Sequence, residues 1–202
     1  MSSKVTPIRA ADPAARTGQA RIISEVRSRV DAWRGFPLGP AGEPYPNEPP
    51  RYDPQREGER PISETTRRLL LHWFRHEPHV VGRAPKTTLF RYWPHQRRLV
   101  ESFIYLYEAL GIRRTEELFQ LCDVEALGPQ RDPWAKLGGQ LATGSGKTKM
   151  MSLLIAWAYL NAAREGEDHL GIGRHSVLIA PGLFVRDRLC SDFFPPDGSP
   201  SV

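Results

Sequence analysis

The sequence is poor in cysteine and has no long apolar run. Its two cysteines, Cys122 and Cys190, stand far apart with no His or Cys cluster beside either, which argues against a zinc site and a disulfide framework. No stretch approaches the ~20 apolar residues of a membrane-spanning helix, and the first residues lack the apolar centre of a secretory signal. We therefore expect a chain without a membrane partner that works in the reducing cytoplasm.

The sequence also lacks the acidic motif of ATP-driven motors. Such motors use an Asp-Glu pair after an apolar strand, in which the aspartate holds Mg²⁺ and the glutamate orients the attacking water. The acidic run at 165–169, Glu-Gly-Glu-Asp-His, follows a helical pattern and indicates a solvated loop. A guanine-reading Asn-Lys-x-Asp motif is missing too. These absences argue against a complete ATP- or GTP-hydrolysing enzyme.

The length and the charge of the chain limit the number of domains and the class of partner that we expect. With 202 residues, 40% of them hydrophobic, the chain can bury one sizeable core, so we expect one domain with appendages. The formal net charge of +5 suits a polyanionic partner. The arginines, however, are scattered in pairs such as Arg67-Arg68 and Arg97-Arg98 instead of forming one block. A solvated basic surface explains this charge equally well.

The most informative segment is residues 142–148, which read Ala-Thr-Gly-Ser-Gly-Lys-Thr. Glycines let backbone amides turn inward around phosphate oxygens, the lysine can reach the β- and γ-phosphates, and the threonine hydroxyl is placed to bind Mg²⁺. An apolar helix follows, so the loop would lie at a helix N-terminus, where amides and the macrodipole favour anions. We predict binding of a nucleoside triphosphate, ATP or GTP, with Mg²⁺, and we assign Lys147 as the catalytic cation and Thr148 as the metal ligand. The predicted phosphate-binding residues are Thr143, Gly144, Ser145, Gly146, Lys147 and Thr148.

The N-terminal third is organised by helices and prolines. Residues 1 to about 18 are small and polar, and we expect a loose arm there. Apolar residues then recur at helical spacing up to Gly35. Prolines crowd residues 36–61 and predict an extended linker. A second helix is predicted from Ser63, a suitable N-cap, to Pro78. We divide the chain into a Pro-rich region with one helix (1–60), a helical extension (61–85) and a nucleotide-binding domain (86–202).

Four segments together resemble a known family. The first position of the phosphate loop is Leu141 rather than glycine, and this form is similar to motif I of superfamily 2 helicases and translocases. The segments TRRLLLHWF, PHQRRLVESFIYLYE, LATGSGKTKMMSLLIAW and SVLIAPGLFVRDRL, spread over residues 63 to 190, resemble restriction-type DEAD/DEAH helicases akin to the Res subunits of type III restriction enzymes. The resemblance implies an ATP-dependent DNA helicase or translocase. Its implied partners are DNA and methyltransferase or nuclease subunits.

The resemblance also assigns an adenine-binding residue. A glutamine amide can accept from adenine N6 and donate to N7 at once. In superfamily 2 a glutamine upstream of motif I does this, and an aromatic or arginine nearby stacks on the ring. Gln96, at the start of a helix predicted up to Leu110, is the matching residue, and Phe90, Arg91 or Tyr92 would supply the stacking face, with Tyr92 as our choice. A surface glutamine on a first helical turn is the alternative.

Two short strands complete the expected fold. Residues 138–141 lead into the phosphate loop, and residues 176–180 lead through Pro181-Gly182 into the helix LFVRDRL. The resemblance implies that this second turn binds the nucleic acid backbone through Gly182, Arg186 and Arg188. We therefore expect an α/β fold: a partial RecA-like P-loop NTPase domain with an incomplete parallel sheet, preceded by a helical, Pro-rich region.

The missing acidic motif and the few strands indicate the N-terminal part of a larger enzyme. On this hypothesis the residues present bind ATP without hydrolysing it alone, and an apolar sheet edge is exposed. Two alternatives stay open at this point. One is a non-enzymatic remnant or DNA-binding fragment, and the other is a different P-loop NTPase of the kinase type.

Overall fold

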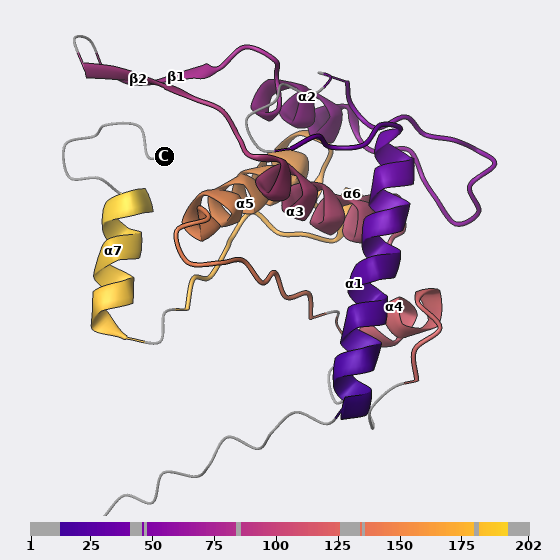
Figure 1. The fold of residues 1–202 in the computed structure, drawn as a ribbon. Coiled ribbons are helices and arrows are strands. Elements are labelled where there is room, and N and C mark those ends of the chain that lie inside the picture. The colour runs from indigo at the N-terminus through magenta and orange to yellow at the C-terminus, as the bar shows by residue number, and fades with distance from the viewer. Residues whose placement is uncertain are drawn as a thin grey trace, which may run out of the picture.

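Helix α1 spans Pro13–Arg34 in the computed structural model, which describes residues 13–40, 46, 48–83, 86–125, 134, 136–179 and 182–193 (Figure 1). Val26, Val30 and Trp33 are buried along one side, as their helical spacing predicts. The helix ends before Gly35, whose φ of +84° is the left-handed conformation that terminates helices. The predicted helix is thus confirmed, but it begins at Pro13, inside the expected loose arm.

Helix α2, Glu64–Trp73, begins where its N-cap predicts, because the Ser63 hydroxyl accepts a hydrogen bond from the Thr66 amide at 2.9 Å. It ends at Trp73, earlier than the predicted stop at Pro78. An antiparallel hairpin of β1, His79–Arg83, and β2, Lys86–Phe90, follows and projects from the helices (Figure 1). This hairpin lies where we expected the end of the helical extension. Its β-branched pairs, at 80–81 and 87–88, are the signal for it.

The central helix α3, Pro94–Ile104, continues into a π-helical turn, η1, at Tyr105–Ala109. Its first residue is a proline, which is suited to a position whose amide has no helical acceptor. A short helix, α4, follows at Thr115–Leu121. The helix predicted to end near Leu110 is confirmed, with its last turn in the π-helical form.

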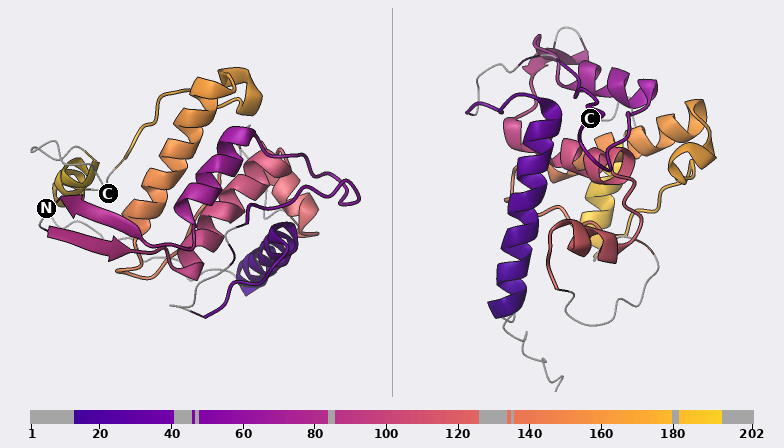
Figure 2. Two further views of the ribbon diagram at one scale, coloured as in Figure 1. Left: turned by 90° about the horizontal axis from the view of Figure 1, so that it is seen from above. Right: turned by 90° about the vertical axis from the view of Figure 1, so that its right-hand side faces the viewer.

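The C-terminal half contributes α5 (Lys147–Arg164), α6 (Glu167–Leu170) and α7 (Leu183–Phe193). Helix α3 packs against α1 and α5, and α2 packs against α5, so these helices surround the core (Figure 2). Helix α7 lies to one side of this group in Figure 1. No helix in the described part of the chain is both long and apolar enough to cross a membrane.

The expected parallel sheet was wrong. Among the described residues the hairpin of β1 and β2 is the sole sheet, and the protein is mostly helical. Residues 138–141 pair with no strand, and their chain runs close to α3 instead: a Cβ built on Gly139 would lie 3.0 Å from Leu99 Cδ1. Residues 176–179 are extended but unpaired, with Val177 85% and Ile179 90% exposed. A strand is stabilised by its ladder, and neither segment meets a neighbouring strand here.

Buried charges join α1 to α3. The Glu101 carboxylate accepts hydrogen bonds from Arg34 Nε at 2.6 Å and Arg97 Nε at 2.7 Å, and all three side chains are almost fully buried. Arg97 also donates to two backbone carbonyls of the proline-rich linker, those of Pro46 and Glu48. One carboxylate therefore links two helices and, through Arg97, the linker.

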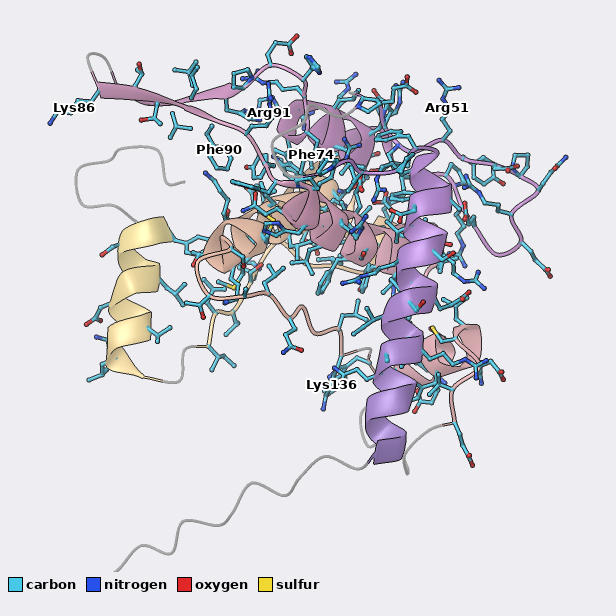
Figure 3. All side chains as sticks on the ribbon, viewed as in Figure 1. Arg51, Phe74, Lys86, Phe90, Arg91 and Lys136 are labelled. Atoms are coloured by element: carbon cyan, nitrogen blue, oxygen red, sulfur yellow. The ribbon has the colours of Figure 1, made fainter. Side chains whose placement is uncertain are left out.

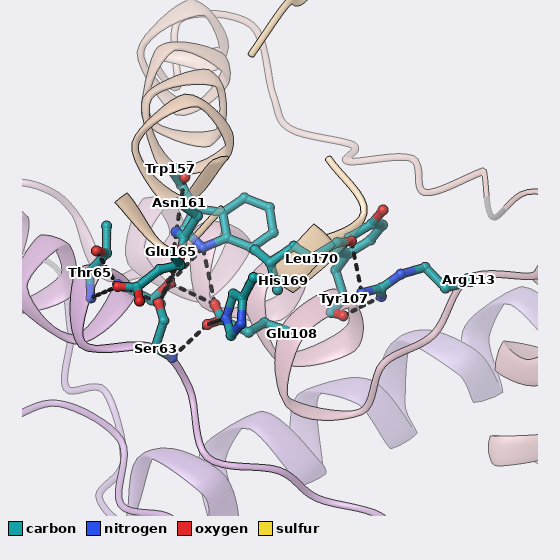
Figure 4. A network of polar contacts seen from close by, with 11 residues as sticks. Ser63, Thr65, Tyr107, Glu108, Arg113, Trp157, Asn161, Glu165, His169 and Leu170 are labelled. Carbon is teal, nitrogen blue, oxygen red and sulfur yellow. Dashed lines mark hydrogen bonds and ion pairs between the residues drawn. The ribbon is translucent and has the colours of Figure 1, made fainter. Parts of the chain in front are cut away.

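A second buried carboxylate, Glu108, joins η1 to α2 and α5 (Figure 4). It accepts hydrogen bonds from the Ser63 amide at 2.7 Å, the Thr66 hydroxyl at 2.6 Å and Trp157 Nε1 at 3.2 Å. Three donors satisfy a carboxylate that water would otherwise solvate. The network fixes α5, and with it the loop that precedes α5, relative to the central helix.

Candidate phosphate-binding loop

The loop at 141–148 runs from the extended segment beside α3 to the N-terminus of α5. Gly144 and Gly146 have φ of +80° and +84°, a conformation that side-chain-bearing residues rarely adopt, which explains the two glycines. Gly146 is also the residue that caps α5. The first amides of an α-helix have no acceptor within the helix, and Gly146 supplies no side-chain cap to those of α5, so they are groups of the kind that bind an anion.

The loop curls around the ammonium of Lys147. Lys147 Nζ donates to the carbonyls of Leu141 at 2.9 Å and Ala142 at 2.8 Å. The same Ala142 carbonyl accepts from the Ser145 hydroxyl at 2.7 Å and the Ser145 amide at 3.3 Å. These contacts place the ammonium of Lys147 inside the turn. The Lys147 side chain as a whole remains exposed to solvent. The arrangement brings together all the loop residues that the sequence predicts, including the partly exposed Thr148.

Gln96 reaches this loop from α3. Its Nε2 donates to the Ser145 carbonyl at 2.9 Å, and its Oε1 accepts from the Trp93 amide at 2.9 Å. The residue is 5% exposed. Gln96 therefore caps its own helix and braces the loop at the same time. An amide carries two donors and two acceptor lone pairs, so these two hydrogen bonds do not use its full capacity, although the buried side chain presents little surface to a ligand.

The predicted stacking residue, Tyr92, lies in an aromatic cluster. Its ring makes edge contacts with Phe74 at 5.5 Å and Phe90 at 4.9 Å between centroids, and the residue is 8% exposed. Figure 3 labels Phe74 and Phe90 near the junction of the hairpin and α3. The ammonium of Lys149 lies 3.7 Å from the Phe90 centroid, and burial lowers the pKa of Lys149 from its usual value. The Tyr92 ring is therefore covered by its own chain.

Two exposed rings that the sequence interpretation missed lie beside the loop. Trp93 is 50% exposed, and His95, also exposed, has its Nε2 3.4 Å from the Ser145 carbonyl. Their ring centroids are 6.3 Å apart. Both come just before Gln96 in the segment Tyr-Trp-Pro-His-Gln, and these two rings next to the glutamine were the signal that the sequence offered. They offer an aromatic surface near the loop that Tyr92 does not.

The predicted nucleic-acid contacts lie on α7. Gly182 is exposed and its carbonyl accepts from the Arg186 amide at 3.0 Å at the start of the helix. Arg186 Nη2 pairs with the neighbouring Asp187 at 2.8 Å, with both side chains more than half exposed. The Arg188 side chain lies outside the described residues. The structure thus places Gly182 and Arg186 on one exposed turn, where an adjacent carboxylate partly offsets the arginine charge.

We expect Gly146→Ala to damage the loop more than Gly144→Ala. Both glycines have positive φ, so alanine costs about 1–2 kcal/mol of stability at either position. A Cβ at Gly146 would also lie 2.5 Å from Gln96 Nε2, whereas a Cβ at Gly144 meets nothing within 4 Å. Loss of the hydrogen bond from Gln96 Nε2 to the Ser145 carbonyl adds about 1 kcal/mol to the destabilisation. Urea unfolding measures the free energy of unfolding of each variant. Equal losses of stability in the two variants would show that the Gln96 hydrogen bond does not stabilise the loop.

No metal-binding group of three or more His, Cys, Asp or Glu residues occurs among the described residues. Mg²⁺ held by one threonine hydroxyl, phosphate oxygens and water needs no such group. No protein-family model, no curated protein and no solved structure matches this chain.

Proposed function

We propose that the loop at 141–148 binds the triphosphate of ATP together with Mg²⁺. The observation that carries the proposal is the hydrogen bond from Gln96 Nε2 to the Ser145 carbonyl, which joins the predicted adenine-binding residue to the predicted phosphate loop across 49 positions of sequence. A glutamine side chain or a serine carbonyl by itself would not indicate a nucleotide site. Their contact is the arrangement expected of a single nucleotide site.

The residues of the loop fit a triphosphate. Left-handed glycines, unpaired amides at a helix N-terminus and one flexible ammonium are the groups that phosphate oxygens require. Lys147 would exchange its two carbonyl acceptors for phosphate oxygens, and the Thr148 hydroxyl would bind Mg²⁺. Mg²⁺ supplies positive charge that neutralises the triphosphate. Gln96 would hold the loop and use its remaining hydrogen-bonding positions on adenine.

The wider role that we propose is ATP binding within a DNA helicase or translocase of the restriction-enzyme type, acting in the cytoplasm. The four-segment motif resemblance supports this role, and the absence of a parallel sheet from the described residues counts against it. Two cysteines without a disulfide, Cys122 and Cys190, fit a reducing compartment. DNA would bind at Gly182, Arg186 and Arg188 through its backbone, without sequence readout.

Titration with a fluorescent ATP analogue tests the proposal. We expect saturable binding that requires Mg²⁺ and is displaced by unlabelled ATP. Inorganic triphosphate should compete, because the loop binds the phosphates, but less well than ATP. Binding that persists unchanged without Mg²⁺, or that triphosphate cannot displace, would contradict a phosphate-centred site.

We expect Gln96→Ala to lose the preference for ATP over GTP. The variant removes the bidentate adenine contact, whose loss costs about 1–3 kcal/mol of base discrimination. It also removes the loop brace, so affinity for both nucleotides should fall. Competition titrations with ATP, GTP and inorganic triphosphate separate the effects: an equal fall for all three would mean that Gln96 acts on the loop alone.

A further inference from the structure

A groove of about 430 Å³ lies between α1, α3, α4 and the segment 136–141. Its floor and walls are largely apolar, and Ile22 from α1, Leu99 and Phe103 from α3, and Leu118 from α4 all face it. A cavity of this size and character is typical of a site for a small molecule, not for a helix or a long peptide. The groove meets the phosphate loop at Leu141, which lines it, but none of the predicted phosphate-binding residues 143–148 is among its lining residues.

The charge in this groove has one sign. Arg27, Arg98 and Lys136 line it, and no Asp or Glu is among the described lining residues (Figure 3 labels Lys136 beside α1). The nearest carboxylate to Arg98 is Asp31, 3.7 Å from its Nε, and Asp31 binds Arg34 Nη1 more closely at 2.5 Å. The Nε atom of Arg98 is buried and makes no hydrogen bond among the described residues.

These features specify the chemistry of a ligand. An apolar body would bury its surface against Leu99, Phe103 and Leu118, which gains about 25 cal/mol for each Å² removed from water. A negative head group would pair with Arg98 and Arg27, which line the groove without an acidic lining residue. It would share Arg98 with Asp31, whose carboxylate lies 3.7 Å from Arg98 Nε and binds Arg34 more closely. A nucleoside triphosphate fits poorly here, because its four negative charges need the backbone amides that the loop offers and an apolar groove lacks.

We propose that this groove binds a small amphipathic carboxylate, with its head group beside Arg27 and Arg98 and its apolar body between α3 and α4. The site is separate from the proposed nucleotide site. Decanoate, below its micellar concentration, is the probe, and decanol is its neutral counterpart with the same chain length. We expect decanoate to bind about fivefold more tightly than decanol, since a partly exposed charge pair contributes up to about 1 kcal/mol.

Two variants and two controls test the assignment by calorimetry and by amide chemical-shift mapping. Arg98→Gln should weaken decanoate binding to the level of decanol and leave decanol unchanged, while the exposed Arg67→Gln on α2 should change neither. Ser102→Phe, which fills the groove from α3, should abolish both. Lys147→Ala should leave decanoate binding intact, so this site and the nucleotide site fail independently.

Shift mapping locates the bound probe. We expect the largest changes at groove residues such as Phe103 and Leu118. Equal affinity for decanoate and decanol, or no effect of Arg98→Gln, would overturn the assignment of the head group. Shifts centred on the exposed apolar residues Val177, Ile179 and Leu183 would overturn the assignment of the groove itself, because the probe would then be bound to that surface.

Discussion

Lys147→Ala is expected to weaken binding of Mg²⁺–ATP by about 10- to 100-fold. The variant removes the only ammonium held inside the described loop, where Nζ lies 2.9 Å from the Leu141 carbonyl and 2.8 Å from the Ala142 carbonyl. A hydrogen bond to a charged group contributes about 1.5–3 kcal/mol, which sets the size of the loss. Titration of the fluorescent ATP analogue measures it.

The stability of this variant should stay close to that of the wild type, because Lys147 is exposed and its carbonyl acceptors can bind water instead. Lys149→Ala is the matched control. Its ammonium lies over the Phe90 ring, outside the turn, so its loss should affect ATP binding far less. Equal losses of ATP affinity in the two variants would indicate a general attraction between positive charge and the nucleotide. Unchanged ATP binding by Lys147→Ala would show that the loop does not bind the phosphates.

Glu101→Gln is expected to destabilise the fold by about 3–5 kcal/mol. The change keeps the size of the side chain but leaves the guanidiniums of Arg34 and Arg97 without their shared buried carboxylate. Removing one partner of a buried ion pair leaves charge that neither water nor protein solvates. Such a loss is a large fraction of the stability of a domain of this size. Urea unfolding followed by tryptophan fluorescence measures it, since Trp33 is buried on the same helix as Arg34.

Glu64→Gln is the control for this prediction. Glu64 pairs with Arg67 and Arg68 on the exposed side of α2, so its removal should change stability little. If Glu101→Gln and Glu64→Gln were equally stable, the buried ion pairs of Glu101 would make no net contribution to stability. In that case the association of α1 with α3 would rest on apolar packing alone.

Helices were predictable from this sequence because their signals are local. The spacing of Val26, Val30 and Trp33, the N-cap at Ser63 and the proline at position 94 each act within one or two turns, and the structure confirms the helices that they mark. The π-helical turn at Tyr105–Ala109 carries no comparable local signal. It instead allows Glu108 to meet donors from two other helices, which is a tertiary constraint.

The sheet was not predictable in the same way. Residues 176–180 have the apolar, β-branched composition of a strand, whereas residues 138–141, Gly-Gly-Gln-Leu, were expected as a strand from their place before the phosphate loop. A strand also needs a partner, and partners are a property of the whole fold. Family resemblance supplied the expected partners, and the described residues do not contain them. The one strand pair among the described residues, the hairpin of β1 and β2, was not predicted, although β-branched pairs stand at 80–81 and 87–88.

The candidate site was partly predictable. The loop motif specifies its own glycine conformations, so Gly144 and Gly146 have the positive φ that the motif predicts, and Lys147 Nζ lies inside the turn. The position of Gln96 beside the loop was expected only from resemblance, and the structure places it there. The covering of Tyr92 and the exposure of Trp93 depend on how the hairpin packs against α2 and α3, which no local pattern encodes.

Amide chemical shifts of the loop during a titration with Mg²⁺–ATP test the central claim most directly. A phosphate held by backbone N–H groups changes the shifts of those amides more than any others. The account predicts that the largest changes occur at Gly144, Ser145, Gly146, Lys147 and Thr148, with smaller changes at the Gln96 side-chain amide. Saturating ATP that leaves the amides of residues 144–148 unmoved would contradict it.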